Sequence, residues 1–527
     1  MANSNLSLDS ISDYYDRCSQ IKKYLILLCA GLISALAFAP VYFFPALIIA
    51  YTVLLIFTIL SIGLKQAFYY GLTFGFGHFF AGLYWIGNSF AVEPSIPDFA
   101  GYVLVALLSC YLAIFPGLTS VVVRYIHKNH SIKRQLLSIV LTFSVVWNIM
   151  EWFRGVLFTG FPWNLTGYVW GFSDAMLQST SIWGVYGLGI FTVFIAIVPL
   201  LLLNRANRIV VSILSIILIA GLYLYGHFRL NQQTEYVKDI NLRVVQANIK
   251  QEDKWPSRNW GKNLITYMTM SEGIEQSGTT HVIWPETAII YSLSEEPLRR
   301  QVISKMLEKG GVVFTGFPRR DRSDGSFKIY NSMIAINDQG EMEAIYDKSH
   351  LVPLGEYIPS FVKTLFIALG FDQLFSGGQN FSEGDGLKTF NIKGLPPVGV
   401  LICYEIIFPG QVTDPSNRPD WLLNITNDAW YGNSSGPRQH LLQTRVRAIE
   451  EGLPVIRSAG TGISAVIDAY GRIIDHIDLN KRGVINSGLP YKIKQTTLYS
   501  IYKQWIFMLI SVIISIVNIV LIRRFTP

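Results

Sequence analysis

Three short segments of the sequence bring together a thiol, a carboxylate and an amine. The segment VGVLICYEIIFPG carries Cys403 directly after an apolar run, HVIWPET carries Glu286 after a shorter apolar run, and YDKSHLVPLGE carries Lys348 in a polar turn. A thiolate is a strong nucleophile, a carboxylate can accept the thiol proton, and an ammonium can stabilise an anion. The residue types and their positions after predicted strands therefore indicate nucleophilic catalysis at Cys403.

Each of these residues also has an ordinary structural interpretation. A free cysteine is usually a small buried hydrophobe, Glu286 could be a surface carboxylate at a strand end, and Lys348 could be a solvated loop lysine. The catalytic interpretation gains weight because all three segments occur in one predicted domain, in the order Glu, Lys, Cys.

The three side chains would divide the chemistry between them. A free thiol has a pKa of about 8.5 and is mostly protonated at neutral pH. We expect Glu286 to take the thiol proton and Lys348 to stabilise first the thiolate and then the oxyanion of a tetrahedral intermediate. The backbone N–H that follows Cys403 would be a second oxyanion donor.

Five further residues are candidates for supporting roles. Glu356 and Glu405 could tune the proton network or hold the catalytic lysine, or they could be structural ion-pair partners. Trp255, Tyr404 and Trp430 could gate the site, although aromatic residues of such a domain are more often core or rim residues.

The composition is that of a membrane protein. Of 527 residues, 51% are hydrophobic and only 15% are charged. Apolar blocks long enough to cross a bilayer predict eight spans, at about 24–40, 45–64, 68–90, 101–123, 136–153, 176–203, 209–227 and 503–522. The first span ends in Ala37-Phe38-Ala39, which resembles a signal-peptidase site, but Pro40 follows directly and we expect a retained anchor.

Basic residues orient the predicted bundle. They gather at alternate ends of the spans: Arg17, Lys22, Lys23, Lys65, Arg124, Lys128, Lys133, Arg134, Arg205, Arg208, Arg523 and Arg524. Because basic loops stay in the cytoplasm, both termini are predicted to be cytoplasmic and the domain after the seventh span to lie outside. The net charge of +7 draws on these anchors and does not indicate nucleic-acid binding.

Cysteine usage and metal motifs narrow the chemistry further. Of the four cysteines, only Cys403 lies in the external domain, where a solitary thiol has no disulfide partner within its domain. The sequence contains neither CxxC nor HExxH, and the four histidines of that domain are scattered. We therefore expect no metal and no cofactor.

The predicted organisation is a membrane bundle over 1–230, a catalytic domain over 240–491 and a final span with a cytoplasmic tail over 500–527. Within the catalytic domain, strands are predicted near 242–247, 281–286, 311–318, 332–337, 398–405, 421–428, 453–460 and 463–470, and helices near 262–276, 298–309 and 437–451. Strands that alternate with helices predict a layered α/β domain.

One segment, Tyr357–Phe375, is too apolar for a solvated loop and too short to span a bilayer. We expect an amphipathic arm in the outer leaflet that guides a lipid chain toward Cys403. The alternative is a core helix of the α/β domain.

The segments WPET, KSHLVPLGE and ICYE together resemble the Glu-Lys-Cys triad of the nitrilase, or carbon–nitrogen hydrolase, superfamily. With LAFAPVYFFP, EWFRGVLFTGFPW and TNDAWYG included, nearly the whole chain resembles the apolipoprotein N-acyltransferases of the bacterial cytoplasmic membrane. One departure from that pattern is Asn164, where we expect an apolar residue.

The resemblance implies an α-β-β-α sandwich attached to the helical bundle, with the catalytic domain on the periplasmic side. It also implies transfer of an acyl chain from a phospholipid to the α-amine of a diacylated apolipoprotein, through a thioester. By the resemblance Cys403 is the nucleophile, Glu286 the base and Lys348 the oxyanion stabiliser. Glu356, Tyr404, Glu405 and Trp255 fall on positions on which the family's function depends.

Two other functions stay open at the level of sequence. A membrane-anchored amidase or nitrilase would hydrolyse a small amide and would not acylate a lipopeptide. A channel or transporter would need charged residues within its spans, and the predicted spans hold few beyond Glu151 and Arg154. A donor and an acceptor that both carry acyl chains meet most readily at a bilayer, which favours acyl transfer.

Overall fold

The computed structural model describes residues 8–89, 98–128, 132–203, 208–273, 278–323, 325–357 and 381–525. The chain divides into two compact units. We call Met1–Gln232 with Thr496–Pro527 the bundle unit, and Gln233–Gln495 the sheet unit. Most of the predicted arm, Tyr357–Phe375, lies outside the described residues.

The described part of the sheet unit forms two six-stranded sheets. In spatial order, the first sheet contains β12 (Gly483–Pro490), β1 (Tyr236–Gln246), β2 (His281–Ile283), β3 (Val312–Asp321), β4 (Lys328–Asn337) and β5 (Met342–Asp347). The second contains β11 (Ile473–Ile477), β10 (Ser464–Ile467), β9 (Val455–Ala459), β8 (Trp421–Thr426), β7 (Val398–Ile402) and β6 (Thr389–Phe390).

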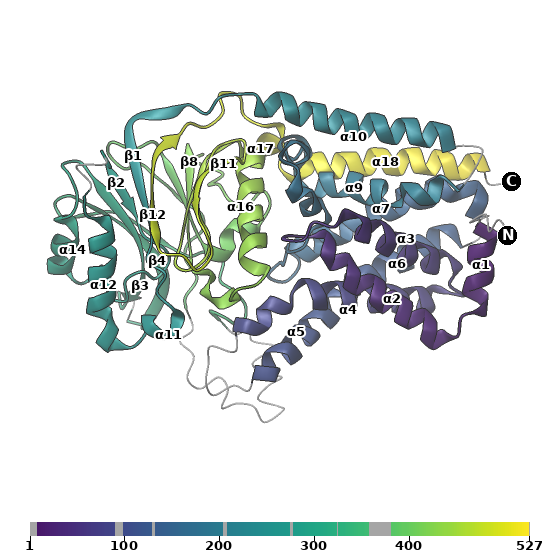
Figure 1. Cartoon of the computed structure of the whole chain (residues 1–527), viewed down its shortest axis with the longest axis horizontal. Helices are drawn as coiled ribbons and strands as arrows, with labels where there is room; N and C mark the ends of the chain where they lie inside the picture. Colours follow the sequence, from purple (N-terminus) through teal and green to yellow (C-terminus); the bar gives the residue numbers. More distant parts are fainter. Residues whose placement is uncertain are drawn as a thin grey trace. The chain divides into compact units, whose positions relative to one another are not determined.

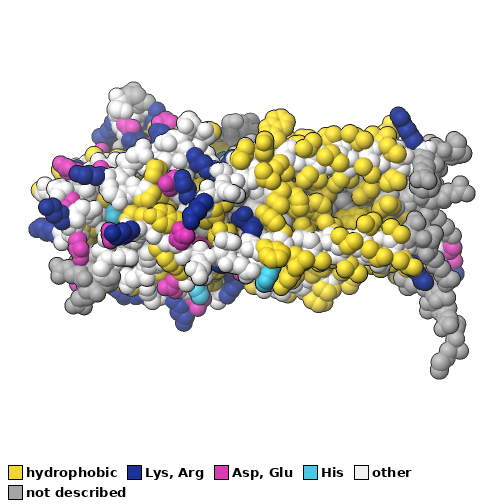
Figure 2. All heavy atoms as spheres, turned by 90° about the horizontal axis from the view of Figure 1, so that it is seen from above, with side chains coloured by type: hydrophobic (Ala, Val, Ile, Leu, Met, Phe, Trp, Pro, Cys, Tyr) yellow, Lys and Arg dark blue, Asp and Glu magenta, His cyan; other side chains and the backbone are white. Residues whose placement is uncertain are grey.

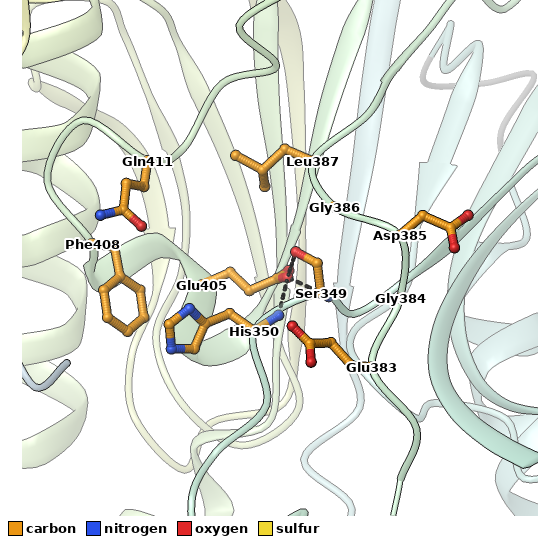
Figure 3. A pocket seen from close by; sticks show the side chains of 10 residues that line it. All are labelled: Ser349, His350, Glu383, Gly384, Asp385, Gly386, Leu387, Glu405, Phe408 and Gln411. Atoms are coloured by element: carbon orange, nitrogen blue, oxygen red, sulfur yellow. Dashed lines mark hydrogen bonds between the residues drawn. The ribbon is translucent and has the colours of Figure 1, made fainter. Parts of the chain in front are cut away.

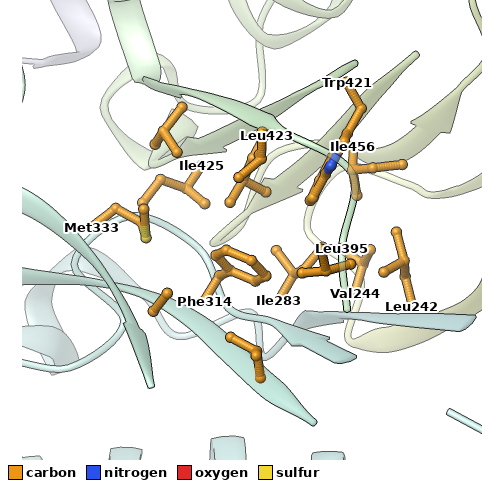
Figure 4. Close-up of a cluster of buried hydrophobic side chains, with 14 of the residues drawn as sticks. Leu242, Val244, Ile283, Phe314, Met333, Leu395, Trp421, Leu423, Ile425 and Ile456 are labelled. Atoms are coloured by element: carbon orange, nitrogen blue, oxygen red, sulfur yellow. The ribbon is translucent and has the colours of Figure 1, made fainter. Parts of the chain in front are cut away.

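The two sheets pack face to face over an apolar core. Figure 4 shows Phe314 and Ile283 of the first sheet directed at Leu423 and Ile425 of the second. Strands β7 and β8 are buried along their whole length. Their sequences, VGVLI and WLLNIT, are mainly apolar, as expected for strands covered on both faces.

Helices cover the outer faces of both sheets (Figure 1). The helices of this unit are α11 (Gln251–Lys254), α12 (Ser257–Ser271), α14 (Pro297–Ser304) and α16 (Gly436–Glu451), with the 3-10 turns η5 (Cys403–Ile407) and η6 (Asp428–Tyr431). A second apolar cluster, with Tyr267 of α12 and Trp284, joins α12 and α14 to the first sheet. The predicted α/β fold with its α-β-β-α layers is confirmed.

The parallel strands set the place of the chemistry. Strands β1, β2 and β3 run parallel in the first sheet, and β7, β8 and β9 run parallel in the second. The carboxyl ends of parallel strands meet at one edge of a sheet, where α/β folds bind their ligands. Glu286 follows β2 and Cys403 follows β7, so both lie at such an edge.

The bundle unit is helical. Its helices are α1 (Leu8–Arg17), α2 (Gln20–Ser34), α3 (Phe44–Leu60), α4 (Leu64–Gly82), α5 (Asp98–Leu112), α6 (Ile114–His127), α7 (Ile132–Val156), α8 (Asp174–Leu177), α9 (Thr180–Leu201), α10 (Arg208–Leu230), α17 (Leu498–Tyr502) and α18 (Gln504–Phe525), with 3-10 turns η1 (Ala35–Ala37), η2 (Tyr84–Ser89) and η3 (Thr166–Phe172).

Six helical segments among the described residues are long and apolar enough to cross a membrane. They lie at Gln20–Ala37, Phe99–His127, Gln135–Val156, Thr180–Leu201, Arg208–Leu230 and Gln504–Arg523. The two other predicted spans, 45–64 and 68–90, coincide with α3, a shorter apolar helix, and with α4.

Glycines allow α4 to pack closely against α2. A Cβ on Gly77 would lie 2.5 Å from the Leu28 carbonyl oxygen of α2, so only glycine permits this approach of the two backbones. Small residues at helix contacts are typical of membrane bundles, where close packing replaces the hydrophobic effect.

The outward faces of α10 and α18 are apolar. Figure 2 shows hydrophobic side chains gathered over the helices, with charged side chains outside this band. The exposed set on α10 and α18 includes Ile209, Ile213, Ile216, Ile217, Trp505, Leu509, Val512, Ile516 and Val520. An apolar surface of this extent on helices of spanning length belongs in lipid.

The charged residues of α7 are used within the protein. Arg154 Nη1 donates to the carbonyl oxygens of Phe161 at 2.6 Å and Trp163 at 2.7 Å, and the Glu151 carboxylate accepts from the Thr166 N–H at 2.9 Å. Both side chains therefore hold the loop after α7. In a transport pathway, such charged side chains would instead face water.

Asn164 lies in that same loop. Its φ is +51°, a left-handed conformation in which asparagine is enriched over other non-glycine residues, and it is buried. The backbone conformation accounts for asparagine where we expected an apolar side chain.

Candidate active site

Cys403 stands at the sharp turn between β7 and η5. Its φ is +53°, and it is 6% exposed. A left-handed conformation at a residue other than glycine costs about 1–3 kcal/mol and persists only where the surroundings enforce it. The strained turn places the thiol at the end of the strand.

Glu405 enforces the turn from within. Its Oε2 accepts the N–H of Ile402 at 2.7 Å, and its Oε1 accepts the hydroxyl of Tyr346 at 2.7 Å and the N–H of Ser349 at 2.8 Å. Tyr346 and Ser349 flank Lys348, so this buried carboxylate ties the Cys403 turn to the loop that carries the lysine.

Glu286 follows β2 and is 6% exposed. Its Oε1 accepts the Asn331 amide at 2.7 Å, whereas its Oε2 has no hydrogen-bond partner among the described residues. A Cβ on Gly316 would lie 2.6 Å from the Glu286 Cα, so a glycine of β3 makes room for this turn.

Lys348 follows β5 and is 1% exposed, and its Nζ lies 2.7 Å from Glu356 Oε2. Glu356 Oε1 accepts from the Asn331 amide at 2.8 Å, and Glu356 Oε2 accepts the N–H of Val352 at 2.8 Å. One amide nitrogen of Asn331 thus joins Glu286 to Glu356, and Glu356 holds Lys348.

The charges of these groups act on one another. Burial and, next, the charge of Glu286 raise the pKa of the Cys403 thiol to about 12, against the lowering effect of Lys348. Burial also raises the pKa of Glu286, against the effect of Lys348. Burial alone would lower the pKa of Lys348, but Glu356, Glu286 and Cys403 together raise it. The resting site therefore holds a thiol beside an ammonium.

The aromatic candidates divide into two groups. Tyr404 is buried and meets the Phe408 ring edge-on, with ring centroids 5.1 Å apart. Trp255 is 43% exposed directly after α11, and Trp430 is 39% exposed in η6. Tyr404 is thus a packed residue of the Cys403 turn, whereas the two tryptophans are partly exposed to solvent.

A cavity of about 250 Å³ lies beside Glu405. Figure 3 shows Ser349 and His350 hydrogen-bonded to Glu405 at its wall. Its lining includes Phe408 and Gln411 but not Glu286, Lys348 or Cys403. Among the described residues no group of three or more His, Cys, Asp or Glu side chains could hold a metal ion.

Sequence reasoning missed a buried ion cluster behind Cys403. Arg457 Nη2 donates to Asp428 Oδ2 at 2.7 Å, and His440 Nδ1 lies 3.0 Å from Asp428 Oδ1. His440 Nε2 lies 3.3 Å from the carbonyl oxygen of Cys403. His440 thus lies between the Asp428 carboxylate and the backbone of Cys403, and the cluster supports the Cys403 turn. Asp428 belongs to the TNDAWYG segment, which was the signal available in the sequence.

Asn331 and Lys254 were also missed. Asn331 lies inside β4, and Lys254 ends α11 with its Nζ 3.4 Å from the Glu286 carbonyl oxygen. Neither residue follows a strand or belongs to a polar motif. Their roles arise from contacts between distant segments.

Comparisons with known proteins identify the family of the chain. A family model described as carbon-nitrogen hydrolase matches residues 241–493, and one described as apolipoprotein N-acyltransferase N-terminal domain matches residues 30–198. Among solved structures, an amidase from Nesterenkonia sp. is 16% identical with a TM-score of 0.35, over 48% of this chain and 92% of that chain.

Relatives match over nearly the full length. The apolipoprotein N-acyltransferase of Rhodopseudomonas palustris is 36% identical, over 96% of this chain and 96% of its own. That of Rickettsia typhi is 34% identical, over 95% of this chain and 98% of its own. By its two matching family models and these full-length relatives, the chain belongs to the apolipoprotein N-acyltransferase family.

Proposed function

We propose that Cys403, Glu286 and Lys348 carry out the acyl transfer of this family, with Cys403 as the covalent nucleophile. Membership in the family makes the chain an acyltransferase of a membrane and implies lipoprotein and phospholipid substrates. The observation that carries the residue assignment is the hydrogen-bonded network of Glu286, Asn331, Glu356 and Lys348 around the strained Cys403 turn.

The first half-reaction acylates the enzyme. Glu286 accepts the thiol proton while Sγ of Cys403 attacks an ester carbonyl of a phospholipid. Lys348 and the backbone N–H after Cys403 stabilise the oxyanion. When the tetrahedral intermediate collapses, the ester C–O bond breaks, and the departing alkoxide takes the proton from Glu286.

The second half-reaction transfers the acyl group. The neutral α-amine of a diacylglyceryl-cysteine attacks the thioester, because its pKa of about 7.7–8.0 leaves part of it unprotonated at physiological pH. The C–N bond forms, the C–S bond breaks, and Glu286 accepts the proton of the amine and returns it to the thiolate.

The remaining residue assignments are part of this proposal. Glu356 holds Lys348, Glu405 holds the nucleophile turn, Tyr404 packs beside it, and Trp255 and Trp430 form the exposed rim at which acyl chains arrive. The geometry that supports these roles is the ion pair of Lys348, the hydrogen bonds of Glu405 and the exposure of both tryptophans.

The proposal includes a place in the cell. We infer a multi-pass protein of the bacterial cytoplasmic membrane, with the catalytic domain over 240–491 on the periplasmic side and the helical parts over 1–230 and 500–527 in the membrane. Support comes from the six candidate spans and from the basic residues at alternate helix ends.

Mass spectrometry of the full-length protein tests the nucleophile. After incubation with vesicles of phosphatidylethanolamine and phosphatidylglycerol, we expect one acyl mass on the Cys403 peptide and none in Cys403→Ala. Addition of a synthetic diacylglyceryl-cysteine peptide should remove it. An acyl group that persists elsewhere in an active Cys403→Ala protein would refute the assignment. Hydrolysis of a small amide without transfer to the peptide would favour the amidase alternative.

A further inference from the structure

The active centre contains a second buried lysine. Lys254 is the last residue of α11, the turn that follows β1, and it is 3% exposed. Its Nζ lies 3.4 Å from the backbone carbonyl oxygen of Glu286. A lysine is almost never fully buried without a paired charge, so its partner must be found.

No direct ion pair accounts for Lys254. An ammonium has three N–H donors, and in the described part of the chain Nζ makes this one long hydrogen bond and has no carboxylate oxygen within 4.0 Å. The other active-site lysine, Lys348, is held by Glu356 at 2.7 Å. Among the residues that the structure describes, Lys254 therefore has no local salt-bridge partner.

Among the described residues, the carboxylate of Glu286 has no cationic side chain in direct contact. Glu356 has Lys348, whereas Glu286 is hydrogen-bonded only to the neutral Asn331, and its Oε2 has no partner among the described residues. Lys254 touches the backbone of this same residue. The buried centre thus contains two carboxylates and two lysines. Glu356 and Lys348 form a direct ion pair, whereas Glu286 and Lys254 interact electrostatically without direct contact between their charged groups.

Other contacts hold the α11 turn in place. Asn427 Nδ2 donates to Gln251 Oε1 at 3.0 Å, and the carbonyl oxygen of Asp253 accepts from Asn259 Nδ2 at 3.0 Å and Asn263 Nδ2 at 3.1 Å. These neutral hydrogen bonds fix the turn without the ammonium of Lys254. A purely architectural role would not require a buried charge at this position.

We propose that Lys254 is a positioning residue whose positive charge keeps Glu286 ionised, so that Glu286 can accept the thiol proton of Cys403. This role rests on the proposed function of Glu286 and Cys403. The proton leaves Sγ for the Glu286 carboxylate and later passes to the departing alkoxide, while Lys254 keeps its own protons throughout. Lys348 remains at the oxyanion, so the two lysines have separate tasks.

The electrostatics of the centre agree in direction. Burial raises the pKa of Glu286, and Lys348 and Lys254 lower it, against Glu356. Burial lowers the pKa of Lys254, Glu286 and Cys403 oppose this effect, and the resulting pKa is about 8. Lys254 is therefore charged at pH values below its pKa. In that range, loss of its charge would raise the pKa of Glu286.

The remaining charged groups lie on the Cys403 side. Asp428 raises the pKa of the thiol, and its own carboxylate is compensated by Arg457 and His440. Burial keeps Tyr431, which also faces Cys403 and Glu286, in its neutral form by raising its pKa. None of these groups replaces the positive charge that Lys254 places at Glu286.

Alkylation of Cys403 tests the proposal without a lipid substrate. The full-length protein is treated with iodoacetamide from pH 5 to 7.5, and the rate is read on the Cys403 peptide by mass spectrometry. The acid limb of this profile is the range in which the alkylation rate rises with pH. It reports the titration of the coupled Glu286–Cys403 pair. We expect Lys254→Met and Lys254→Gln to move the limb upward by about one pH unit, the low end for a nearby opposite charge.

The two variants separate charge from packing. Glutamine can still donate to the Glu286 carbonyl but carries no charge, and it keeps the test open if Lys254→Met does not fold. Lys250→Met is the matched control, because Lys250 precedes the same turn with its side chain 75% exposed. We expect its profile to equal that of the wild type. A Lys254→Gln profile that is lower in rate but unmoved in pH would overturn the proposal.

Glu286→Gln distinguishes failure of this inference from failure of the proposed function. If the acid limb disappears in Glu286→Gln but stays in place in Lys254→Gln, only the role of Lys254 is wrong. If Glu286→Gln keeps the wild-type limb, Glu286 is not the base, and both proposals fail.

Discussion

At the level of single residues, the proposed chemistry depends on Asn331, which joins two carboxylates of the site. Its amide nitrogen has two hydrogens, and each faces a different carboxylate, Glu286 at 2.7 Å and Glu356 at 2.8 Å. Two carboxylates in one buried site repel each other and favour protonation of one of them. A shared neutral donor allows both to stay ionised while it fixes their orientation.

Removal of this donor should impair acylation. In Asn331→Ala the two carboxylates face each other without the amide, so the pKa of Glu286 rises and less of it can act as a base. We expect formation of the acyl-enzyme to slow by about 100-fold, the low end for a general base, with the acid limb displaced to higher pH. Quenched mass spectrometry of Cys403 measures this rate.

The same strand supplies a matched control. Asn337 also bridges two carboxylates, Glu341 at 3.1 Å and Glu343 at 2.8 Å, at the other end of β4. Asn337→Ala should acylate at the wild-type rate. Equal losses in both variants would mean that the effect comes from the stability of β4.

The candidate residues that could be predicted from the sequence are those whose role can be inferred from residue type and neighbouring sequence alone. Cys403 and Glu286 each follow an apolar run, and Lys348 lies in a polar turn of the same predicted domain. Asn331 and Lys254 could not be found in this way, because an asparagine inside a strand and a lysine on a short helix are ordinary. Only the packing of β4 and α11 against the strand ends brings them to the site.

Among the elements, β8, η6, α16 and β9 meet at the buried cluster of Asp428, His440 and Arg457. Burial would raise the pKa of Asp428, but Arg457 and His440 hold it well below its usual range. A carboxylate with a lowered pKa in the folded state stabilises the protein above its unfolded pKa of about 3.9, and this contribution is lost as the pH falls toward the folded pKa.

Asp428→Asn should therefore destabilise the protein in a pH-dependent way. Loss of one partner of a buried ion pair costs about 3–5 kcal/mol, so the melting midpoint in detergent should fall clearly at pH 7. The difference from the wild type should shrink below pH 4. Asp420→Asn is the control, because Asp420 pairs with Lys492 at the surface, where an ion pair contributes at most about 1 kcal/mol. A difference that stays constant down to pH 3 would contradict this account.

The strands that the sequence did not predict share one property. Strands β12, β5, β11 and β6 are the four edges of the two sheets. An edge strand has one neighbour and one face or side open to solvent, so its sequence mixes polar with apolar residues, as in the exposed positions of β11. Each of the eight inner strands contains a stretch of buried, mainly apolar residues, which is why their positions were predictable.

In the bundle unit, the contact between α2 and α4 gives a third prediction. In Gly77→Ala the new methyl group would lie 2.5 Å from the Leu28 carbonyl oxygen, so the helices must separate. Overpacking of this kind costs about 1–3 kcal/mol. Gly221→Ala on α10 makes the same change where nothing lies within 4 Å, and it should be neutral or slightly stabilising. Thermal midpoints of both variants in detergent would show this contrast, and equal midpoints would contradict it.

At the scale of the whole molecule, the membrane topology depends on whether the number of spans before the sheet unit is odd. Of the six candidate spans among the described residues, five precede Gln233. If α3 and α4 form a hairpin, either both helices cross the membrane or neither does. The number of spans before the sheet unit is then seven or five. Both counts place the sheet unit opposite the N-terminus and return the C-terminus to the N-terminal side.

The basic residues predict which side that is. Arg17, Arg124, Arg208 and Arg523 lie at helix ends on the same side in either count, and Lys65 joins them only if α3 and α4 cross. Green fluorescent protein fused after Pro527 should fluoresce, and alkaline phosphatase fused there should be inactive, because the former works in the cytoplasm and the latter outside it. Insertion of the same reporters after Gly63, between α3 and α4, distinguishes the two counts, since cytoplasmic activity there requires eight spans. An active phosphatase after Pro527 would reverse the orientation and place Cys403 in the cytoplasm, away from the acceptor that the proposed function requires.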